Sequence, residues 1–503
     1  MSGKSPFKLH KAGNDPRAAA VQVLFRVLHE QTDAQAALDA ALASPYLAPV
    51  DRGLCTELVY GALRRYPGLG AFAESFLARP EKIPEEMKIS LITAIYEMAF
   101  LRSPHHASVG WAVSHIRNRF GRVLSGVANA VLRSAQRELP AYRKRCDSYD
   151  CLETPPDAAE GAGAKGAADV PAWITQMWFD HYGSEAARAL TRASCLAPPV
   201  GLRLNRAAPA WEELRSELLR AVAPESLSPR ETGNACAAEN AGAGREDGEK
   251  KVPAVLALGD CSLAFFASLP YAARRALDQG RASRQSVASA EILNFFSPSD
   301  WPPPLWDCCA GRGGKTLALL EQGIRVDLAS DISARRLDGL ARDYARLGLS
   351  ALPCPRLLRL DVSDPDFGAG GAKDGEGTRL VSDSPDLAER TDLPEQFGTI
   401  LLDAPCSGLG TLARRPEIRL RRSPADVENL ARLQARMLEA LWPRLKKGGC
   451  LIYMTCTVSP AENEGQTADF LNRHPEAALG REFRTPFSSP LREFFYGAQI
   501  VKS

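Results

Sequence analysis

Two cysteines lie where a thiol could act as a nucleophile. Cys406 lies in LLDAPCSGLG and Cys456 in YMTCTVSPAENE, and each follows an apolar segment and precedes turn-forming residues. A thiol with a pKa near about 8.5 is only partly ionised at neutral pH, yet its thiolate is a strong nucleophile. For either cysteine alone, a buried structural role is the usual interpretation. Two thiols in such corresponding positions favour a shared reactive site.

A glycine-rich stretch, DCCAGRGGKT from Asp307 to Thr316, is the second candidate for chemistry. A Walker-type phosphate loop requires a glycine at the position that Cys309 occupies. The dinucleotide-binding pattern also fails, because Thr316 stands where its last small residue belongs. The stretch is basic and rich in glycine, but it does not specify a ligand by itself.

Aspartates close the apolar segments around this stretch. PPLWD, RVDLASD and GTILLDA end in or next to Asp307, Asp331 and Asp403, and Asp361 ends PRLLRLD. Asp331 follows Gly311 at the distance of about 20 residues that suits an acid accepting hydrogen bonds from a ribose. Each aspartate alone could equally be a helix cap or a turn residue. Several at successive strand ends favour an adenosine pocket without a phosphate cradle.

These groups together fit the methylation of cytosine. Carbon 5 of cytosine is a poor nucleophile, whereas addition of a thiolate to carbon 6 makes the ring enamine-like and activates carbon 5. Asp403 could place an acid beside the ring nitrogen, and a second thiol could assist product release. The chain has 12 cysteines but no C-x-x-C spacing, so we expect reduced thiols and no metal site.

Alternating strands and helices must position these residues. From about residue 290 the pattern runs strand then helix, and residues 425–442 form a clear helix before the strand CLIYMTC. This pattern predicts an α/β fold, with a doubly wound, Rossmann-like domain over residues 290–503. Ligands of such sheets bind beyond the carboxyl ends of the strands, where the aspartates and the glycine stretch fall.

The rest of the chain divides by composition. Amphipathic helical patterns in residues 1–146 predict an all-helical N-terminal domain, and this part is more basic than the formal charge of +2 suggests. No apolar run is long enough for a bilayer and the start lacks a signal-peptide core, so we expect a cytoplasmic protein without a membrane partner. The further predicted segments are a linker over 147–170, an intermediate RNA-recognition subdomain over 171–289, and insertions near 224–252 and 366–395.

The motifs DCCAGRGGKT, ASDISARRL, RLDV, DAPCSGLGTLARRPEIR and YMTCTVSPAENE, in this order, resemble those of the Sun (Fmu) family of S-adenosylmethionine-dependent RNA cytosine-carbon-5 methyltransferases. ELVYGALR, FLRSPHHASVGWAV and VANAVLR resemble the NusB-like RNA-binding domain of the bacterial branch that modifies small-subunit (16S) ribosomal RNA. The resemblance covers nearly the whole chain apart from the linker and the insertions. It implies S-adenosylmethionine as cofactor and ribosomal RNA as substrate.

The resemblance also implies roles by position. The family's nucleophile falls on Cys456, the cysteine that assists product release falls on Cys406, and Asp403 falls beside both cofactor and base. Its cofactor-binding residues fall on Cys309, Ala310, Gly311, Arg312, Gly313, Gly314, Lys315, Asp331, Asp361 and Asp403.

The chain departs from the family in a few places. The loop usually reads Cys-Ala-Ala-Pro-Gly-Gly-Lys, whereas Gly311 and Arg312 replace its Ala-Pro pair. Glycine loosens that turn and arginine adds a charge near the carboxylate end of the cofactor, so we expect altered affinity and retained binding. Ser286 stands where an acid is common, and the C-terminus keeps only part of the usual ending.

Arginines after the Cys406 loop are candidates for RNA contact. The stretch RRPEIRLRR is basic and follows the loop directly, where substrate phosphates would approach, although a solvated basic turn is the alternative. A target base within an RNA helix would have to be flipped out. The predicted contacts are Arg414, Arg415, Arg419, Arg421 and Arg422, with weaker candidates at Arg64, Arg65, Arg143, Lys144 and Arg145.

Other functions remain open at this point. The same chemistry on transfer RNA differs only in its substrate. DNA cytosine methylation is less favoured, because its nucleophile usually lies in the Pro-Cys motif, here Cys406. A non-catalytic RNA-binding assembly factor built on the NusB-like domain is a different class of protein, and the presence of both thiols and all the acids argues against it.

Overall fold

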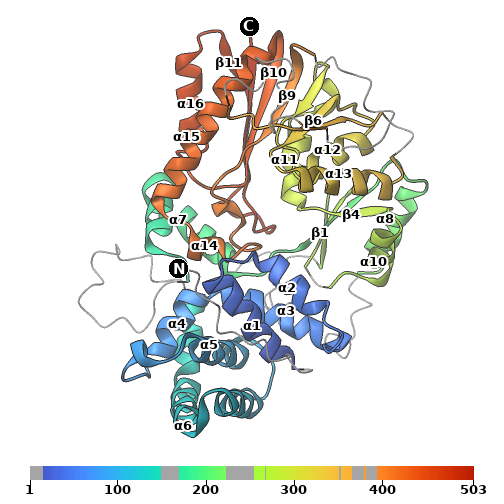
Figure 1. The fold of residues 1–503 in the computed structure, drawn as a ribbon. Coiled ribbons are helices and arrows are strands. Elements are labelled where there is room, and N and C mark those ends of the chain that lie inside the picture. Colours follow the sequence, from blue (N-terminus) through green and yellow to red (C-terminus); the bar gives the residue numbers. More distant parts are fainter. Residues whose placement is uncertain are drawn as a thin grey trace. The chain divides into compact units, whose positions relative to one another are not determined.

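The chain forms two compact units (Figure 1). The computed structural model describes residues 15–148, 169–222, 254–266, 268–349, 353–364, 379–380 and 394–503. The helical unit comprises Met1–Ala197 and Leu412–Arg421, and the sheet unit comprises Pro198–Thr411 and Arg422–Ser503. Most of the predicted linker and nearly all of both predicted insertions lie outside the described residues.

The helical unit confirms the predicted all-helical N-terminal domain. Its first helix begins after Asp15, whose side chain accepts a hydrogen bond from the Arg17 N–H, and Pro16 takes the first helical position. Apolar side chains of residues 19–142 form one continuous core in this unit. The helices are α1 (Pro16–His29), α2 (Ala34–Leu42), α3 (Arg52–Arg64), α4 (Tyr66–Glu74), α5 (Glu85–Phe100), α6 (His105–Ser148), α7 (Ala172–Cys195) and α14 (Ile418–Arg421).

The main sheet of the sheet unit has the order β11-β12-β10-β9-β5-β6-β7-β8. Its central strands pair in parallel and its outer pairs are antiparallel. The chain order reverses at β5, between β6 and β9, and ligands bind at such a switch point. The strands are β5 (Leu305–Asp307), β6 (Leu328–Asp331), β7 (Arg356–Arg359), β8 (Arg379–Leu380), β9 (Phe397–Asp403), β10 (Leu445–Thr455), β11 (Ala477–Arg484) and β12 (Tyr496–Lys502).

Helices pack on both faces of this sheet, which confirms the predicted doubly wound, Rossmann-like fold (Figure 1). Alternate residues of a strand point to opposite faces. Leu401 therefore joins the core under α11 (Val287–Phe295), α12 (Gly314–Glu321) and α13 (Ala334–Arg346), whereas Ile400 and Leu402 join the core under α15 (Pro424–Leu441) and α16 (Glu464–Arg473). The start of α15 is fixed by a capping box between Ser423 and Asp426.

A smaller antiparallel sheet in the order β2-β3-β1-β4 precedes the main sheet. The strand β1 has the sequence VGLRL. The predicted intermediate subdomain differs at its start, because α7 belongs to the helical unit and the sheet unit begins at Pro198. The elements are β1 (Val200–Leu204), α8 (Trp211–Arg220), β2 (Val255–Leu258), β3 (Ser262–Phe265), α10 (Tyr271–Asp278) and β4 (Ala282–Arg284).

No helix within the described part of the chain is both long and apolar enough to span a bilayer.

Candidate active site

The two predicted thiols lie side by side. The Sγ atoms of Cys406 and Cys456 are 3.3 Å apart. Asp403 at the end of β9 pairs in register with Met454 of β10, and the Ala404 N–H donates to the Met454 carbonyl at 2.8 Å. The two loops therefore leave neighbouring parallel strands at the same edge of the sheet, as the sequence predicted.

The two thiols share a hydrogen bond in which either sulfur can be the donor. The hydrogen bond with Cys456, together with burial, raises the pKa of the Cys406 thiol well above its ordinary value. With Cys406 as the donor, a Cys456 thiolate would be stabilised, which is compatible with the nucleophile role that the sequence resemblance implies for Cys456.

A buried carboxylate connects the two thiol loops. Glu462 has no exposed surface, and its Oε1 and Oε2 accept hydrogen bonds from the Ser407 N–H at 2.8 Å and the Ser407 hydroxyl at 2.5 Å. Gln434 Nε2 donates to the same carboxylate at 3.1 Å, and burial raises the pKa of Glu462. Sequence reasoning missed Glu462 and Ser407. The only available signal was an acid in the polar segment after Cys456.

A glycine allows the loops to approach closely. The Gly410 N–H donates to the Cys456 carbonyl at 3.1 Å, and the Phe494 N–H donates to the Gly410 carbonyl at 2.9 Å. A Cβ at Gly410 would lie 2.1 Å from the Phe494 carbonyl oxygen, closer than real contacts allow. Glycine is therefore required here for the backbone contact that holds the Cys406 and Cys456 loops together.

Lys315 connects the glycine loop to the thiol site. Its Nζ donates a hydrogen bond to Asp403 Oδ2, and the Lys315 side chain is buried. Burial lowers the pKa of Lys315, but the Asp403 carboxylate raises it by more, so the net shift is upward. Lys315 is therefore an ammonium group bonded to the acid that lies at the end of β9.

The glycine loop is held at the ends of β5 and β6. The Gly311 N–H donates to Asp331 Oδ2 at 3.0 Å, and the Ser333 N–H donates to Asp331 Oδ1 at 2.8 Å. Gly313 has φ +82°, and a Cβ there would lie 2.5 Å from Leu340 Cγ. Gly311 has φ +57°, but a Cβ there would meet no atom within 4 Å. The loop is thus closely packed at Gly313 and open at Gly311.

The other predicted acids differ in their surroundings. Asp361 follows β7, is exposed, and accepts hydrogen bonds from the Ser363 N–H at 3.0 Å and hydroxyl at 2.7 Å. Asp307 at the end of β5 is buried and accepts a hydrogen bond from the Thr316 hydroxyl at 2.6 Å. Burial raises the pKa of Asp307 to about 7. Within the described ranges no His, Cys, Asp and Glu side chains gather in a group that could hold a metal ion.

Arg312 extends over α13. Its exposed guanidinium lies 4.0 Å from the Asp343 carboxylate of that helix. The expected effect of its charge on the carboxylate end of the cofactor stays a prediction. The contact is at the limit for an ion pair and largely solvated, so it contributes little to stability.

Two of the predicted RNA-contacting arginines hold the helical unit together. Arg419 is 1% exposed, and its Nη atoms donate to the carbonyls of Arg64 at 2.5 Å, Asp169 at 3.0 Å, Ser194 at 2.6 Å and Leu412 at 3.1 Å. These bonds use the Nη donors, and the Nε donor is buried, so the guanidinium is not accessible to a phosphate. Arg421 Nη2 likewise donates to the carbonyls of Val27 at 2.7 Å and Thr32 at 2.6 Å. We therefore no longer assign Arg419 to RNA, whereas Arg421 is half-buried and its assignment stays a prediction.

For the remaining arginines of this stretch, contact with RNA stays a prediction. Arg415 is 56% exposed and forms only long ion pairs, 3.9 Å to Asp33 and 3.6 Å to Glu417. Arg422 lies in the sheet unit, and its Nε donates to the Ser407 carbonyl at 3.3 Å, next to the Cys406 loop. Arg414 is half-buried. Of the weaker candidates, Arg64 and Arg65 are buried within the helical unit.

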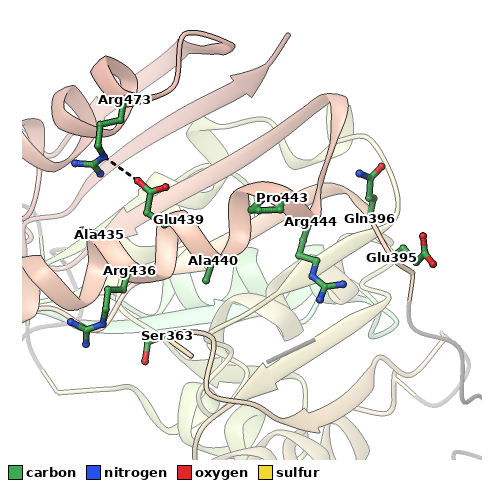
Figure 2. A pocket seen from close by; sticks show the side chains of 10 residues that line it. All are labelled: Ser363, Glu395, Gln396, Ala435, Arg436, Glu439, Ala440, Pro443, Arg444 and Arg473. Carbon is green, nitrogen blue, oxygen red and sulfur yellow. Dashed lines mark hydrogen bonds and ion pairs between the residues drawn. The ribbon is translucent and has the colours of Figure 1, made fainter. Parts of the chain in front are cut away.

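A groove of about 900 Å³ in the sheet unit is not lined by any of the predicted catalytic, cofactor-binding or RNA-contacting residues. It runs along α15, where Arg473 of α16 pairs with Glu439 at 3.0 Å (Figure 2). No sequence-predicted site residue lines it, so we do not include it in the site. Its lining consists of Ser363, Glu395, Gln396, Ala435, Arg436, Glu439, Ala440, Pro443, Arg444 and Arg473.

Comparison with known proteins matches both halves of the chain. Residues 297–490 match the family model described as 16S rRNA methyltransferase RsmB/F, and residues 14–137 match the NusB family. Ribosomal RNA small subunit methyltransferase B of Vibrio vulnificus is 31% identical over 494 residues, which cover 97% of this chain and 99% of that protein. The probable methyltransferase of the same name from Bacillus subtilis is 28% identical over 477 residues, 93% of this chain and 91% of that protein.

The fold has a counterpart among solved structures. The crystal structure of PH0851 has a TM-score of 0.64 and 19% sequence identity, and the similarity covers 97% of this chain and 99% of that one. At this identity the similarity supports the fold alone. The predicted combination of a NusB-like helical domain with a Rossmann-like methyltransferase domain is confirmed.

Proposed function

Because this chain belongs to the family of the 16S rRNA methyltransferases RsmB/F, we propose that it methylates carbon 5 of a cytosine in small-subunit ribosomal RNA. The observation that carries this proposal is the 3.3 Å contact between the Cys406 and Cys456 thiols. The acid at the end of the same strand, Asp403, is bonded to Lys315 of the glycine loop. A nucleophile, a second thiol and an acid thus gather at one edge of the sheet.

The residues at this edge fit S-adenosylmethionine. Asp331 ends β6, where a carboxylate accepts hydrogen bonds from ribose hydroxyls, and the backbone is open at Gly311. The loop Cys309–Lys315, Asp331 and Asp361 would hold the cofactor, and Lys315 offers a cation beside it. When bound, S-adenosylmethionine supplies an electrophilic methyl group to carbon 5. The loop lacks a phosphate cradle, which agrees with a ligand that has no phosphate.

Cys456 begins the reaction as a thiolate that adds to carbon 6 of the cytosine ring. The new carbon–sulfur bond shifts the ring's electrons toward carbon 5 and ring nitrogen 3, and the nitrogen takes a proton. The Lys315 ammonium supplies that proton through the Asp403 carboxylate to which it is bonded, so Asp403 relays the proton to the nitrogen. Carbon 5 is then electron-rich and accepts the methyl group.

Cys406 completes the reaction by removing the proton of carbon 5. The hydrogen bond with Cys456 is the largest cause of its raised pKa, and that cause is lost once the Cys456 sulfur is bonded to carbon. With that cause removed, Cys406 is more readily deprotonated and can act as the base. As carbon 5 loses its proton, the ring double bond reforms, the carbon–sulfur bond breaks, and Cys456 leaves as a thiolate, while nitrogen 3 returns its proton through Asp403.

The test is incubation with labelled S-adenosylmethionine and unmodified small-subunit ribosomal RNA. Wild type should yield labelled 5-methylcytosine, Cys456→Ala should yield none, and Cys406→Ala should accumulate a covalent protein–RNA adduct. Cys450→Ala is the matched control, because Cys450 is a buried cysteine on β10 that contacts Thr399 instead of the thiol pair. It should retain activity.

Other outcomes would redirect the proposal. Label on transfer RNA but not on ribosomal RNA would keep the chemistry and replace the substrate. RNA binding without any incorporation of label would indicate that the protein is a non-catalytic assembly factor. Formation of a covalent adduct by Cys456→Ala would show that Cys406 is the nucleophile and that the assigned roles of the two thiols are reversed.

A further inference from the structure

An arginine of the small sheet reaches the helix that follows the glycine loop. Arg203 lies on β1 and is 4% exposed. Its Nε and Nη2 atoms donate to the two carboxylate oxygens of Glu321, at 2.7 Å and 2.8 Å, and its Nη1 donates to the Gly314 carbonyl at 2.8 Å. This is a buried, two-pronged ion pair with an additional bond to the backbone.

One guanidinium holds both ends of α12. Gly314 is the first residue of this helix and Glu321 is the last, about two turns apart and on the same face. The Glu321 side chain points back along that face, as helical side chains do. Arg203 therefore fixes the position of α12 along its whole length.

A second side chain of the small sheet supports the same contact. Gln285, directly after β4, donates from Nε2 to the Gly314 carbonyl at 3.1 Å and accepts a hydrogen bond from Arg203 Nη1. The Gly314 carbonyl thus accepts from two side chains of the small sheet. Asn205 extends the connection to α13, because its Nδ2 donates to the Leu347 carbonyl at 2.9 Å.

The charge on Glu321 requires Arg203. A carboxylate at the carboxyl end of a helix faces the negative end of the helix dipole. Glu321 is also buried, and burial raises its pKa while the Arg203 guanidinium acts in the opposite direction. Without Arg203 a buried carboxyl group would be left unpaired at the end of α12, so the pair and the helix position depend on each other.

The first turn of α12 carries the residues that contact the proposed cofactor site. Lys315 follows Gly314 directly and bonds to Asp403, and the preceding loop is bonded to Asp331 through Gly311. We propose that Arg203, together with Glu321 and Gln285, is a positioning residue for S-adenosylmethionine, so that the small sheet sets the place of the cofactor loop. This inference rests on the proposed cofactor site at residues 309–315.

The experiment separates positioning from folding. The double variant Arg203→Met/Glu321→Met replaces a buried ion pair by apolar side chains of similar length, an exchange that often preserves stability. It also removes the Arg203 bond to the Gly314 carbonyl. We expect an unfolding temperature close to that of wild type, unchanged affinity for ribosomal RNA, and about 10-fold weaker binding of S-adenosylhomocysteine by calorimetry, as for other contacts that support a binding site.

A matched pair in the helical unit is the control. Arg17 and Glu97 form a two-pronged pair of the same kind, with Glu97 buried, Arg17 partly buried and bonds of 2.8 Å and 2.6 Å, so Arg17→Met/Glu97→Met should leave S-adenosylhomocysteine binding unchanged. Wild-type affinity in Arg203→Met/Glu321→Met would overturn the inference. If that variant does not fold, Gln285→Ala decides, since it removes the other donor to Gly314 from a half-buried position. Weaker binding would support the inference and unchanged binding would overturn it.

Binding of S-adenosylhomocysteine by wild type distinguishes a failure of the proposed cofactor site from a failure of the positioning role of Arg203. If wild type does not bind S-adenosylhomocysteine, the proposed cofactor site fails, and the inference fails with it. If wild type binds and both Arg203→Met/Glu321→Met and Gln285→Ala bind equally well, only the positioning role fails.

Discussion

Glu462 accepts hydrogen bonds from both the backbone N–H and the hydroxyl of Ser407, so a carboxylate of the Cys456 loop holds the Cys406 loop. The loops come from different strands and meet through this contact and through the backbone hydrogen bond from Gly410 to the Cys456 carbonyl. The 3.3 Å separation of the sulfur atoms is thus maintained by a residue that touches neither thiol directly. Four predictions follow from this and related contacts.

The first prediction concerns Glu462 itself. Glu462→Ala leaves the Ser407 donors without their acceptor in a fully buried position, so we expect a loss of about 2–3 kcal/mol in the free energy of unfolding. Urea denaturation of the sheet unit within the full chain measures this. Glu439→Ala removes an exposed carboxylate paired with Arg473 and should change stability by less than about 1 kcal/mol. Equal losses in the two variants would contradict the role of Glu462.

The second prediction concerns the pH dependence of stability. The pKa of Asp307 is raised by burial from 3.8 to about 7, so the folded state binds more protons than the unfolded state between these values. Ionisation of Asp307 therefore lowers the stability of the folded state as pH rises from about 4 to 7, and the full destabilisation is reached above that range. Asp307→Asn keeps an oxygen that can accept from Thr316 and removes the charge.

We expect Asp307→Asn to be more stable than wild type at pH 8, by on the order of 2 kcal/mol, and similar to it near pH 4. Thermal unfolding across this pH range is the measurement. Parallel stability curves for the two proteins at all pH values would show that Asp307 does not titrate in this window.

The sequence predicted the main site because its signals are local. Strand-then-helix alternation placed Asp331, Asp403 and both thiols at strand ends, and parallel strands bring those ends to one edge. Glu462 and Ser407 could not be found in this way, because a polar residue in a loop gives no sign of its partner in another loop. Their hydrogen bonds exist only after β9 and β10 have paired.

Runs of charged residues were the least informative signal for predicting which side chains contact RNA. The arginines of RRPEIRLRR look alike in sequence, but Arg419 is buried among carbonyl oxygens whereas Arg415 is exposed. The difference arises because the Arg419 side chain is surrounded by carbonyls of Arg64, Asp169 and Ser194, which are distant in sequence, whereas Arg415 has no such surroundings among the described residues. Arg203 illustrates the same limit, since an arginine in a short strand gives no indication of a buried partner on a distant helix.

The third prediction separates these two arginines. Arg419→Met leaves several carbonyls of the helical unit without a donor, so we expect a loss of about 3 kcal/mol or more in the free energy of unfolding. Arg415→Met should leave stability nearly unchanged and weaken RNA binding. If Arg415 contacts a phosphate, the slope of log affinity against log salt concentration should fall by about 1. An unaltered slope would remove Arg415 from the RNA-contacting set.

The fourth prediction concerns oxidation of the thiol pair. The sulfur atoms of Cys406 and Cys456 need to approach from 3.3 Å to about 2.05 Å to form a disulfide. With oxidised glutathione as oxidant, the two thiols would lose two protons and two electrons, and the oxidant would be reduced to two glutathione molecules. We expect a Cys406–Cys456 disulfide by peptide mass spectrometry, together with loss of the methyltransferase activity and its recovery on addition of dithiothreitol.

Variants at each sulfur test whether the loss of activity arises from this bond. Cys406→Ser should not form the disulfide, and its Cys456 should instead be found as a mixed disulfide with glutathione. Cys450→Ala keeps both sulfur atoms and should be inactivated like wild type. Inactivation of wild type without a Cys406–Cys456 peptide would mean that oxidation acts elsewhere. Persistence of two free thiols under conditions that oxidise other exposed cysteines would show that the loops hold the sulfur atoms too rigidly to bond.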